Sequence, residues 1–234
     1  MITTYAIILA GGRGLRLAAK TPKQFLPLGG KPVIAWSLEL CENLSEVSHI
    51  LVVVPGEFIP QIDSLIKTHG ITKHIMTVPG GATRQESAYH ALAAVNFADT
   101  DLLIFHDAAR PFVSPETMQV CIAAAQEHGA AAAYVPVHDT IAVIDDNFVT
   151  SVPLRDRMYY AQTPQGFRFS IIKAAHEKAR KERRSGTDDV SLVLAAGFRV
   201  KMIDGDYSNF KITTDYDYQA ACGIADTKHT TARR

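Results

Sequence analysis

A glycine-rich loop followed by two basic side chains is the part of this sequence best suited to chemistry. Glycines at positions 11, 12 and 14 follow an apolar run, and Arg16 and Lys23 come within the next nine residues. Glycine allows backbone N–H groups to approach phosphate oxygens closely, and fixed cations balance the charge of a polyphosphate. The pattern predicts a triphosphate site, and a solvated basic loop is the alternative interpretation.

The loop differs from two common phosphate-binding motifs. A Walker A loop needs Gly-Lys-Ser/Thr, which is absent here. A dinucleotide fingerprint that begins at Gly12 would need a small residue where Leu17 stands. It would also need an acidic residue at the end of the next strand, which instead ends Val54-Pro55. Neither motif explains the loop.

The distribution of charge favours a small anionic ligand. The chain has 24 basic and 24 acidic residues, so neither a nucleic-acid partner nor a membrane partner is expected. The first acidic residue is Glu39, and the basic residues before it are Arg13, Arg16, Lys20, Lys23 and Lys31. An unopposed cationic patch in a neutral chain favours a small, highly charged anion.

Composition limits the class of protein. The 234 residues are 47% hydrophobic and 21% charged, which is typical of a globular protein, and no apolar run is long enough to span a membrane. Cys41, Cys121 and Cys222 are odd in number and far apart, which favours reduced thiols and gives no zinc spacing. We therefore expect one domain over residues 1–234 and a cytoplasmic location.

Apolar runs that alternate with helical patterns must position the loop. Buried strands are predicted over residues 5–9, 49–54, 73–78, 102–105 and 131–137. Helices are predicted over residues 83–96 and 114–129, the second with Pro115 in its first turn and Gly129 at its end. This alternation predicts an α/β fold: a mostly parallel, Rossmann-like sheet with helices on both faces. Ligands of such sheets bind at the carboxyl ends of the strands.

One segment interrupts the alternation. Residues 140–144 and 148–152 flank Asp145-Asp146-Asn147, which is typical of a β-hairpin turn. A lone hairpin is marginally stable in water, so this protruding arm, about residues 138–157, must pack on something. Residues 225–234 carry little apolar content and are expected to fray.

Taken together, the motifs resemble nucleotidyltransferases that join a sugar or polyol phosphate to a nucleotide. The resemblance is strongest to the 2-C-methyl-D-erythritol 4-phosphate cytidylyltransferase family of the non-mevalonate isoprenoid pathway, in order over about residues 5–220. The matching pieces are Pro22-Lys23-Gln24-Phe25, Gly80-Gly81-x-x-Arg84-x-x-Ser87, His106-Asp107-Ala108-Ala109-Arg110-Pro111-Phe112, Asp139-Thr140, Gln162-Thr163-Pro164-Gln165-x-Phe167, Thr187-Asp188-Asp189 and Asn209-x-Lys211-Ile212-Thr213.

One departure keeps a second acceptor open. Leu9-Ala10-Gly11-Gly12 stands where the family commonly has Ala-Ala-Gly, and the related enzyme that makes CDP-ribitol often has the form seen here. Ribitol 5-phosphate is therefore an alternative acceptor. Ala109 and Thr187-Asp188-Asp189 favour 2-C-methyl-D-erythritol 4-phosphate.

The resemblance implies roles for individual residues. Arg16 and Lys23 would be catalytic, because in-line attack at the α-phosphate builds negative charge that fixed cations stabilise. The attacking phosphate monoester is already anionic, so no general base is required. The implied nucleotide-binding residues are Ala10, Gly11, Gly12, Gly14, Gly81 and Ser87. The implied acceptor-binding residues are Asp107, Thr140, Arg155, Thr163, Thr187 and Lys211.

Two of these residues also have a plain structural interpretation. Asp107 would meet the acceptor hydroxyls or a divalent metal, and the alternative is a capping aspartate. Ser87 would read the base, and the alternative is a helix residue bonded to its own backbone. His106 is expected to be packed, without a ligand. The implied cofactor is Mg²⁺ or another divalent cation, which would bridge triphosphate oxygens.

The implied partners are CTP, a polyol phosphate and a second copy of the chain. In the family, the hairpin that carries Thr140 and leads to Arg155 reaches across a homodimer, which would give the arm its packing partner. A nucleotide-binding regulatory module without catalysis is the alternative from another class. The Arg16 and Lys23 pair argues against it, because simple binding would not need both cations at the α-phosphate.

Overall fold

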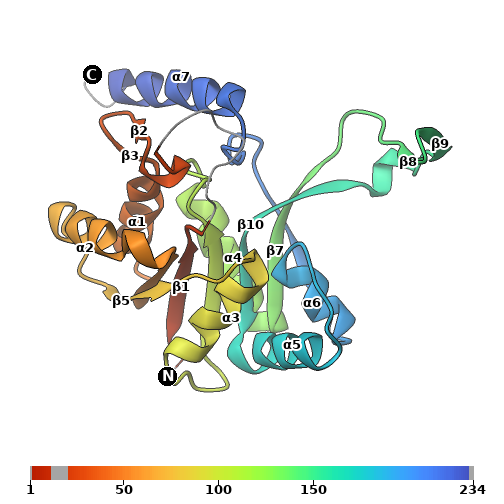
Figure 1. The fold of residues 1–234 in the computed structure, drawn as a ribbon, viewed down its shortest axis with the longest axis horizontal. Helices are drawn as coiled ribbons and strands as arrows, with labels where there is room; N and C mark the ends of the chain where they lie inside the picture. The colour runs from red at the N-terminus through yellow and green to blue at the C-terminus, as the bar shows by residue number, and fades with distance from the viewer. Residues whose placement is uncertain (1, 12–20, 232–234) are drawn as a thin grey trace.

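A seven-stranded sheet runs through the middle of the molecule (Figure 1). The computed structural model describes residues 2–11 and 21–231. In order across the sheet, the strands are β11 (Lys201–Asp204), β7 (Ala130–Pro136), β10 (Tyr159–Arg168), β6 (Leu102–Asp107), β1 (Thr4–Leu9), β4 (His49–Val54) and β5 (His74–Pro79). The five strands predicted from the sequence are all present, with ends that differ from the predicted ones by at most two residues.

Most neighbouring strands are parallel. Strand β1 pairs in parallel with β4 and β6, β4 with β5, and β11 with β7. Strand β10 is the exception, because it runs antiparallel to both β6 and β7. The predicted mostly parallel sheet is confirmed, and the carboxyl ends of β1, β4, β5 and β6 therefore lie at one edge.

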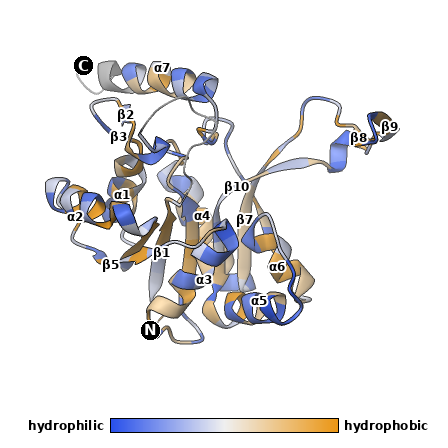
Figure 2. Ribbon diagram, viewed as in Figure 1, coloured by the Kyte–Doolittle hydropathy of each residue, from blue (hydrophilic) through white to orange (hydrophobic). Residues whose placement is uncertain are grey.

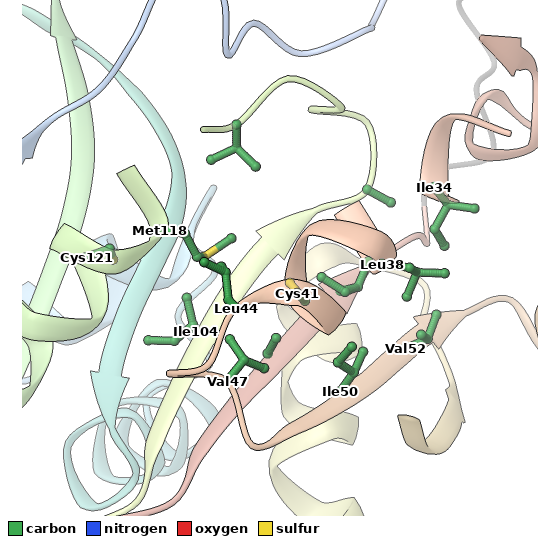
Figure 3. Packing of buried hydrophobic residues seen from close by; sticks show 14 of the residues in the cluster. Ile34, Leu38, Cys41, Leu44, Val47, Ile50, Val52, Ile104, Met118 and Cys121 are labelled. Carbon is green, nitrogen blue, oxygen red and sulfur yellow. The ribbon is translucent and has the colours of Figure 1, made fainter. Parts of the chain in front are cut away.

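Helices cover both faces of the sheet, as predicted. Helices α1 (Val33–Asn43), α2 (Ile59–Thr68) and α4 (Pro115–His128) pack on the face that includes Ala6 and Ile8 of β1 (Figure 3). Helices α3 (Arg84–Ala94), α5 (Phe169–Lys181) and α6 (Asp189–Ala195) pack on the face that includes Tyr5 and Ile7. Successive strand residues point to opposite faces, so an almost wholly apolar strand is buried on both sides. Figure 2 shows the central strands in hydrophobic colours and the helices in mixed colours.

Local signals account for the ends of the helices that lead to the site. The hydroxyl of Thr83 accepts a hydrogen bond from the Glu86 N–H, and the Glu86 carboxylate accepts one from the Thr83 N–H. This capping box starts α3. Ser114 caps α4 in a similar way, and Gly129 ends that helix with a φ of 82°. The predicted start and end of α4 are confirmed.

The predicted hairpin is present and stands apart from the body. Strands β8 (Val143–Asp145) and β9 (Phe148–Ser151) pair across a two-residue turn, in which Asp146 and Asn147 have φ values of 46° and 63°. Two positive φ values fit a type I′ turn, whose twist matches that of the strands. Figure 1 shows this arm projecting away from the sheet.

The last helix corrects one expectation. Helix α7 (Asp215–Thr231) includes residues 225–231 of the segment 225–234 predicted to fray, and residues 232–234 lie outside the described residues. Ala221 and Ala225 of this helix are buried. They pack in a small cluster with Leu28 of β2 (Pro27–Leu28), which pairs with β3 (Lys31–Pro32). Tertiary burial thus extends the helix beyond its apolar composition. Short 3₁₀ turns occupy Lys23–Phe25, Gly56–Phe58 and Arg155–Arg157.

No helix among residues 2–11 and 21–231 combines the length and the apolar character that a membrane crossing needs.

Candidate active site

A cavity of about 770 Å³ opens at the carboxyl edge of the sheet. Its walls come from the segments that follow four strands: residues 10–11 after β1, 55–57 after β4, 80–84 after β5 and 107–109 after β6. Lys23 and Lys211 complete the lining from more distant parts of the chain. The volume suits a small-molecule ligand, and the place is where α/β sheets bind theirs.

One wall of the cavity is held by the Ser87 hydroxyl. Ser87 Oγ donates to the Thr83 carbonyl at 2.9 Å and accepts a hydrogen bond from the Gly81 N–H at 3.1 Å. Ser87 therefore bonds to its own helix, as the structural interpretation expects, and it also lines the cavity, whereas its role in reading the base stays a prediction. A Cβ atom on Gly81 would lie 2.4 Å from Glu86 Cβ, so only glycine fits there.

The first loop contributes Ala10 and Gly11 to the lining. Ala10 is fixed from two sides: its N–H donates to the Val53 carbonyl at 2.7 Å, and its carbonyl accepts from Gln24 Nε2 at 2.8 Å. Three predicted residues, Gly12, Gly14 and Arg16, lie outside the described residues.

Lys23 also lines the cavity. Its ammonium group donates a hydrogen bond to the Ile212 carbonyl at 2.9 Å, and the side chain lines the cavity. The residue lies at the start of a 3₁₀ turn that follows Pro22. A cation at this place can face a phosphate group of a bound nucleotide.

Asp107 lies at the end of β6 among three cations. Its carboxylate contacts Lys211 Nζ at 2.7 Å, Arg84 Nε at 3.5 Å and Arg110 Nε at 4.0 Å. Burial raises the pKa of Asp107, but the charges of Lys211 and Arg84 outweigh it and hold the pKa well below the usual range. Asp107 is therefore ionised, and its carboxylate is bonded to side chains rather than used as a backbone cap.

Arg84 also lines the cavity. It lies in one of the sequence motifs, but the motif predicts no role for it. Its Nη1 donates to Asp189 Oδ2 at 2.6 Å, and Asp189 Oδ1 lies 3.0 Å from His176 Nε2. Burial lowers the pKa of Arg84, but the negative charges of Asp189 and Asp107 raise it by more than burial lowers it. The pKa of Arg84 is therefore above its usual value. The only signal in the sequence was its place in Gly80-Gly81-x-x-Arg84.

Four predicted acceptor residues lie outside the cavity lining. Thr163 is buried, and its hydroxyl bonds to the Asp107 N–H and the His106 ring. Thr187 is exposed just before α6. Thr140 and Arg155 are exposed on the arm, where Arg155 donates to the His138 carbonyl at 3.2 Å. The structure thus brings Asp107 and Lys211 together with Lys23 and the nucleotide residues, and leaves the arm residues apart.

The described residues do not form a metal site by themselves. No group of three His, Cys, Asp or Glu side chains among them lies close enough together to hold a metal ion. Asp107, the residue predicted to contact a metal, has its carboxylate surrounded by cations. These residues therefore do not fit a metal that the protein holds alone.

The sheet and the cavity define a class of protein. A mostly parallel sheet with a glycine-walled, cation-lined cavity at its carboxyl edge is typical of α/β proteins that bind phosphorylated ligands. Within that class, the chain belongs to the IspD family, described as 2-C-methyl-D-erythritol 4-phosphate cytidylyltransferase, whose model matches residues 4–226.

Individual relatives agree with the family match. A protein of Syntrophotalea carbinolica named 2-C-methyl-D-erythritol 4-phosphate cytidylyltransferase is 40% identical over 227 residues, which are 97% of each chain. One of the same name from Geobacter metallireducens is 41% identical and covers 92% of this chain and 94% of its own. The crystal structure of 4-diphosphocytidyl-2C-methyl-D-erythritol synthase from Anaerococcus prevotii superposes with a TM-score of 0.85 at 30% identity, covering 96% of both chains.

Proposed function

We propose that this chain is a cytidylyltransferase that joins CTP and 2-C-methyl-D-erythritol 4-phosphate. The products are 4-diphosphocytidyl-2-C-methyl-D-erythritol and pyrophosphate. The family match over residues 4–226 and relatives of that name at about 40% identity support this assignment. The structural observation that carries it is one cavity whose lining combines small residues with the cations Lys23, Lys211 and Arg84.

The small residues of the lining are suited to the base. Gly11 and Gly81 lie beside Ser87, where larger side chains would intrude into the space or collide with Glu86. The Ser87 proton is donated to the Thr83 carbonyl and one lone pair accepts from the Gly81 N–H, so one further acceptor position remains on its oxygen. These small residues and their polar backbone groups are proposed to bind the cytosine base.

The cations of the lining, Lys23, Lys211 and Arg84, are suited to the phosphates. A phosphate oxygen of the acceptor attacks the α-phosphorus of CTP, an oxygen–phosphorus bond forms, and the bond to the β-phosphate bridging oxygen breaks to release pyrophosphate. Negative charge grows on the equatorial oxygens during this step. Lys23 stabilises that charge from a fixed position, and Arg16 on the preceding loop is proposed to act with it. The attacking phosphate is already anionic, so it needs no general base.

The acceptor is proposed to lie between Asp107 and Lys211 of one subunit and the arm of another. Thr140 and Arg155 on the arm would then complete the acceptor site, with Thr163 and Thr187 near it. The arm exposes large apolar side chains, including Phe148 and Leu154, each 74% exposed. Such a surface on a lone hairpin suits burial against a second copy, so the proposal includes a homodimer that exchanges arms.

Magnesium is proposed to enter with the nucleotide. Phosphate oxygens of CTP are hard ligands that Mg²⁺ prefers, and the described residues offer no cluster that would hold the ion without them. The ion would neutralise charge on the triphosphate, and we assign it no protein ligand.

A cytoplasmic location belongs to the same proposal. Cys41, Cys121 and Cys222 are free, and the first two are buried. Burial raises the pKa of the Cys41 and Cys121 thiols to about 12, so both are unreactive. Nothing in these thiols calls for an oxidising compartment.

The test is pyrophosphate release from the purified protein. With CTP, Mg²⁺ and 2-C-methyl-D-erythritol 4-phosphate, we expect pyrophosphate and an equal amount of a CDP-polyol, detected by ³¹P NMR. Omitting any component should abolish both products. CTP binding without release under the full mixture would overturn the proposal and leave a non-catalytic nucleotide-binding module.

A further inference from the structure

A closed ring of hydrogen bonds surrounds the backbone of Asp107. The Asp107 N–H donates to Thr163 Oγ1 at 3.1 Å, and Thr163 Oγ1 lies 3.0 Å from His106 Nδ1. His106 Nε2 lies 3.1 Å from the Arg110 carbonyl oxygen, and the Arg110 N–H donates to the Asp107 carbonyl at 2.9 Å. All four residues are buried.

The ring allows one arrangement of protons. The Arg110 carbonyl can only accept, so His106 Nε2 must carry a proton. Burial lowers the pKa of His106 to about 4, so the ring is neutral and Nδ1 is an acceptor. Thr163 must then donate its proton to Nδ1 while its oxygen accepts from the Asp107 N–H. In this arrangement every donor of the ring has an acceptor, and every acceptor has a donor.

The Thr163 hydroxyl replaces a missing strand partner. The antiparallel ladder between β6 and β10 ends at the pair Phe105 and Gln165, two residues before Asp107. Beyond that pair, the Thr163 hydroxyl oxygen accepts a hydrogen bond from the Asp107 N–H. The Thr163 carbonyl also accepts from Asn209 Nδ2 at 2.8 Å, next to the segment that carries Lys211.

We propose that His106 is a positioning residue, which orients the Thr163 hydroxyl and thereby fixes the backbone that aims the Asp107 carboxylate into the cavity. This inference rests on the proposed function, in which Asp107 belongs to the acceptor site. His106 itself does not line the cavity. Its effect reaches the substrate through Thr163 and Asp107. Loss of His106 should therefore weaken use of the acceptor more than it weakens binding of the nucleotide.

Two amide substitutions separate the two sides of the imidazole. In His106→Asn the amide oxygen takes the place of Nδ1 and can still accept from Thr163. In His106→Gln the amide nitrogen takes the place of Nε2 and can still donate to the Arg110 carbonyl, but the acceptor for Thr163 is gone. The two variants are matched in chemistry and differ in which hydrogen bond they keep.

We expect His106→Gln to lower kcat/KM for 2-C-methyl-D-erythritol 4-phosphate by about tenfold or more, because small displacements of a binding group are costly. The Kd for CTP, measured by calorimetry, should change by less than about twofold. His106→Asn should recover most of the loss. Equal losses in both variants, or equal losses for both substrates, would show a merely structural role and overturn the inference.

Thr163→Val provides a second, independent comparison. If His106 acts through the Thr163 hydroxyl, His106→Gln combined with Thr163→Val should be no worse than the worse single variant. Losses that multiply would overturn the inference. If His106→Gln does not fold, Thr163→Ser against Thr163→Val decides the question: recovery of the acceptor KM by serine alone supports it, and equal defects oppose it.

The wild-type protein in the same assay keeps the two proposals apart. No pyrophosphate release by wild type with either acceptor would defeat the proposed function. An active wild type with indistinguishable His106→Asn and His106→Gln variants would defeat only the positioning role.

Discussion

The ammonium group of Lys23 donates a hydrogen bond to the carbonyl oxygen of Ile212 at 2.9 Å, across 189 positions of sequence. The neighbouring residue, Lys211, contacts the Asp107 carboxylate at 2.7 Å. The Ile212 N–H in turn donates to the Ala109 carbonyl. One short segment therefore contacts both a cation from the N-terminal region and a carboxylate at the end of β6, and it links these two parts of the cavity lining.

Substitution of Lys23 should affect turnover more than nucleotide affinity. A cation that acts mainly on transition-state charge is worth on the order of 3 kcal/mol, so Lys23→Ala should lower kcat about a hundredfold or more. Lys67→Ala, at an exposed lysine of α2, is the matched control and should retain wild-type kinetics. Steady-state rates of pyrophosphate release decide the matter. A rise in KM for CTP with unchanged kcat would assign Lys23 to ground-state binding instead.

Glycine at position 81 should be irreplaceable for a steric reason. The Cβ of Gly81→Ala would lie 2.4 Å from Glu86 Cβ, so either the loop or the start of α3 must move. We expect a loss of about 1–3 kcal/mol of stability by urea unfolding, with weaker CTP binding. Gly223→Ala in α7 meets no atom within 4 Å and should stabilise by about 0.5–1 kcal/mol. If Gly81→Ala bound CTP with the affinity of the wild type, Gly81 would not belong to the nucleotide site.

The sequence predicted five strands, four of which are almost wholly buried, and it missed β10 and β11. The composition of β10 explains the first omission. That strand contains Gln162, Thr163, Pro164 and Gly166, a composition that argues against a central strand. Its position depends on pairing with β6 and β7, which no local pattern records. At the C-terminal segment the expectation of fraying is wrong for residues 225–231, which are helical, and Ala225 is buried by contacts from elements distant in the sequence.

The cavity residues divide in a similar way. Gly11 and Lys23 could be found because phosphate loops need glycine and cations near a strand end, whereas Ala10 and Gly81 were found only through the resemblance to the family. The bonds from Arg84 to Asp189 and from Asp189 to His176 could not be found, because they join three helices. Sequence patterns fix which groups are available, whereas packing fixes which of them pair.

The neutral His106 makes stability depend on pH. Burial lowers its pKa from 6.5 to about 4, so the unfolded chain takes up a proton that the folded chain refuses between these values. This stabilising contribution is full above pH 6.5 and decreases as the pH falls toward 4. Between pH 7 and pH 5 the loss from this group is about 2 kcal/mol. Urea unfolding should show that the wild type loses that much more stability than His106→Asn; equal pH dependence would mean that His106 titrates normally.

Two inactive variants should complement each other if the arms are exchanged. Lys23→Ala damages the subunit's own nucleotide site, and Arg155→Ala damages the site that its arm reaches. In a mixed two-fold dimer one site would collect both defects and the other neither. With free exchange, half of the dimers are mixed, so about a quarter of wild-type activity should return. No recovery in mixed dimers confirmed by native mass spectrometry would place Arg155 in its own subunit's site.

The choice of acceptor tests the central claim most directly. We would measure kcat/KM for 2-C-methyl-D-erythritol 4-phosphate and for ribitol 5-phosphate side by side, with saturating CTP and Mg²⁺. Ala109, which lines the cavity beside Asp107, and the Thr187-Asp188-Asp189 stretch favour the methylerythritol substrate. The account predicts at least about a hundredfold preference for 2-C-methyl-D-erythritol 4-phosphate, since a site built around a substrate's hydroxyls discriminates strongly. Equal or better kcat/KM with ribitol 5-phosphate would contradict it.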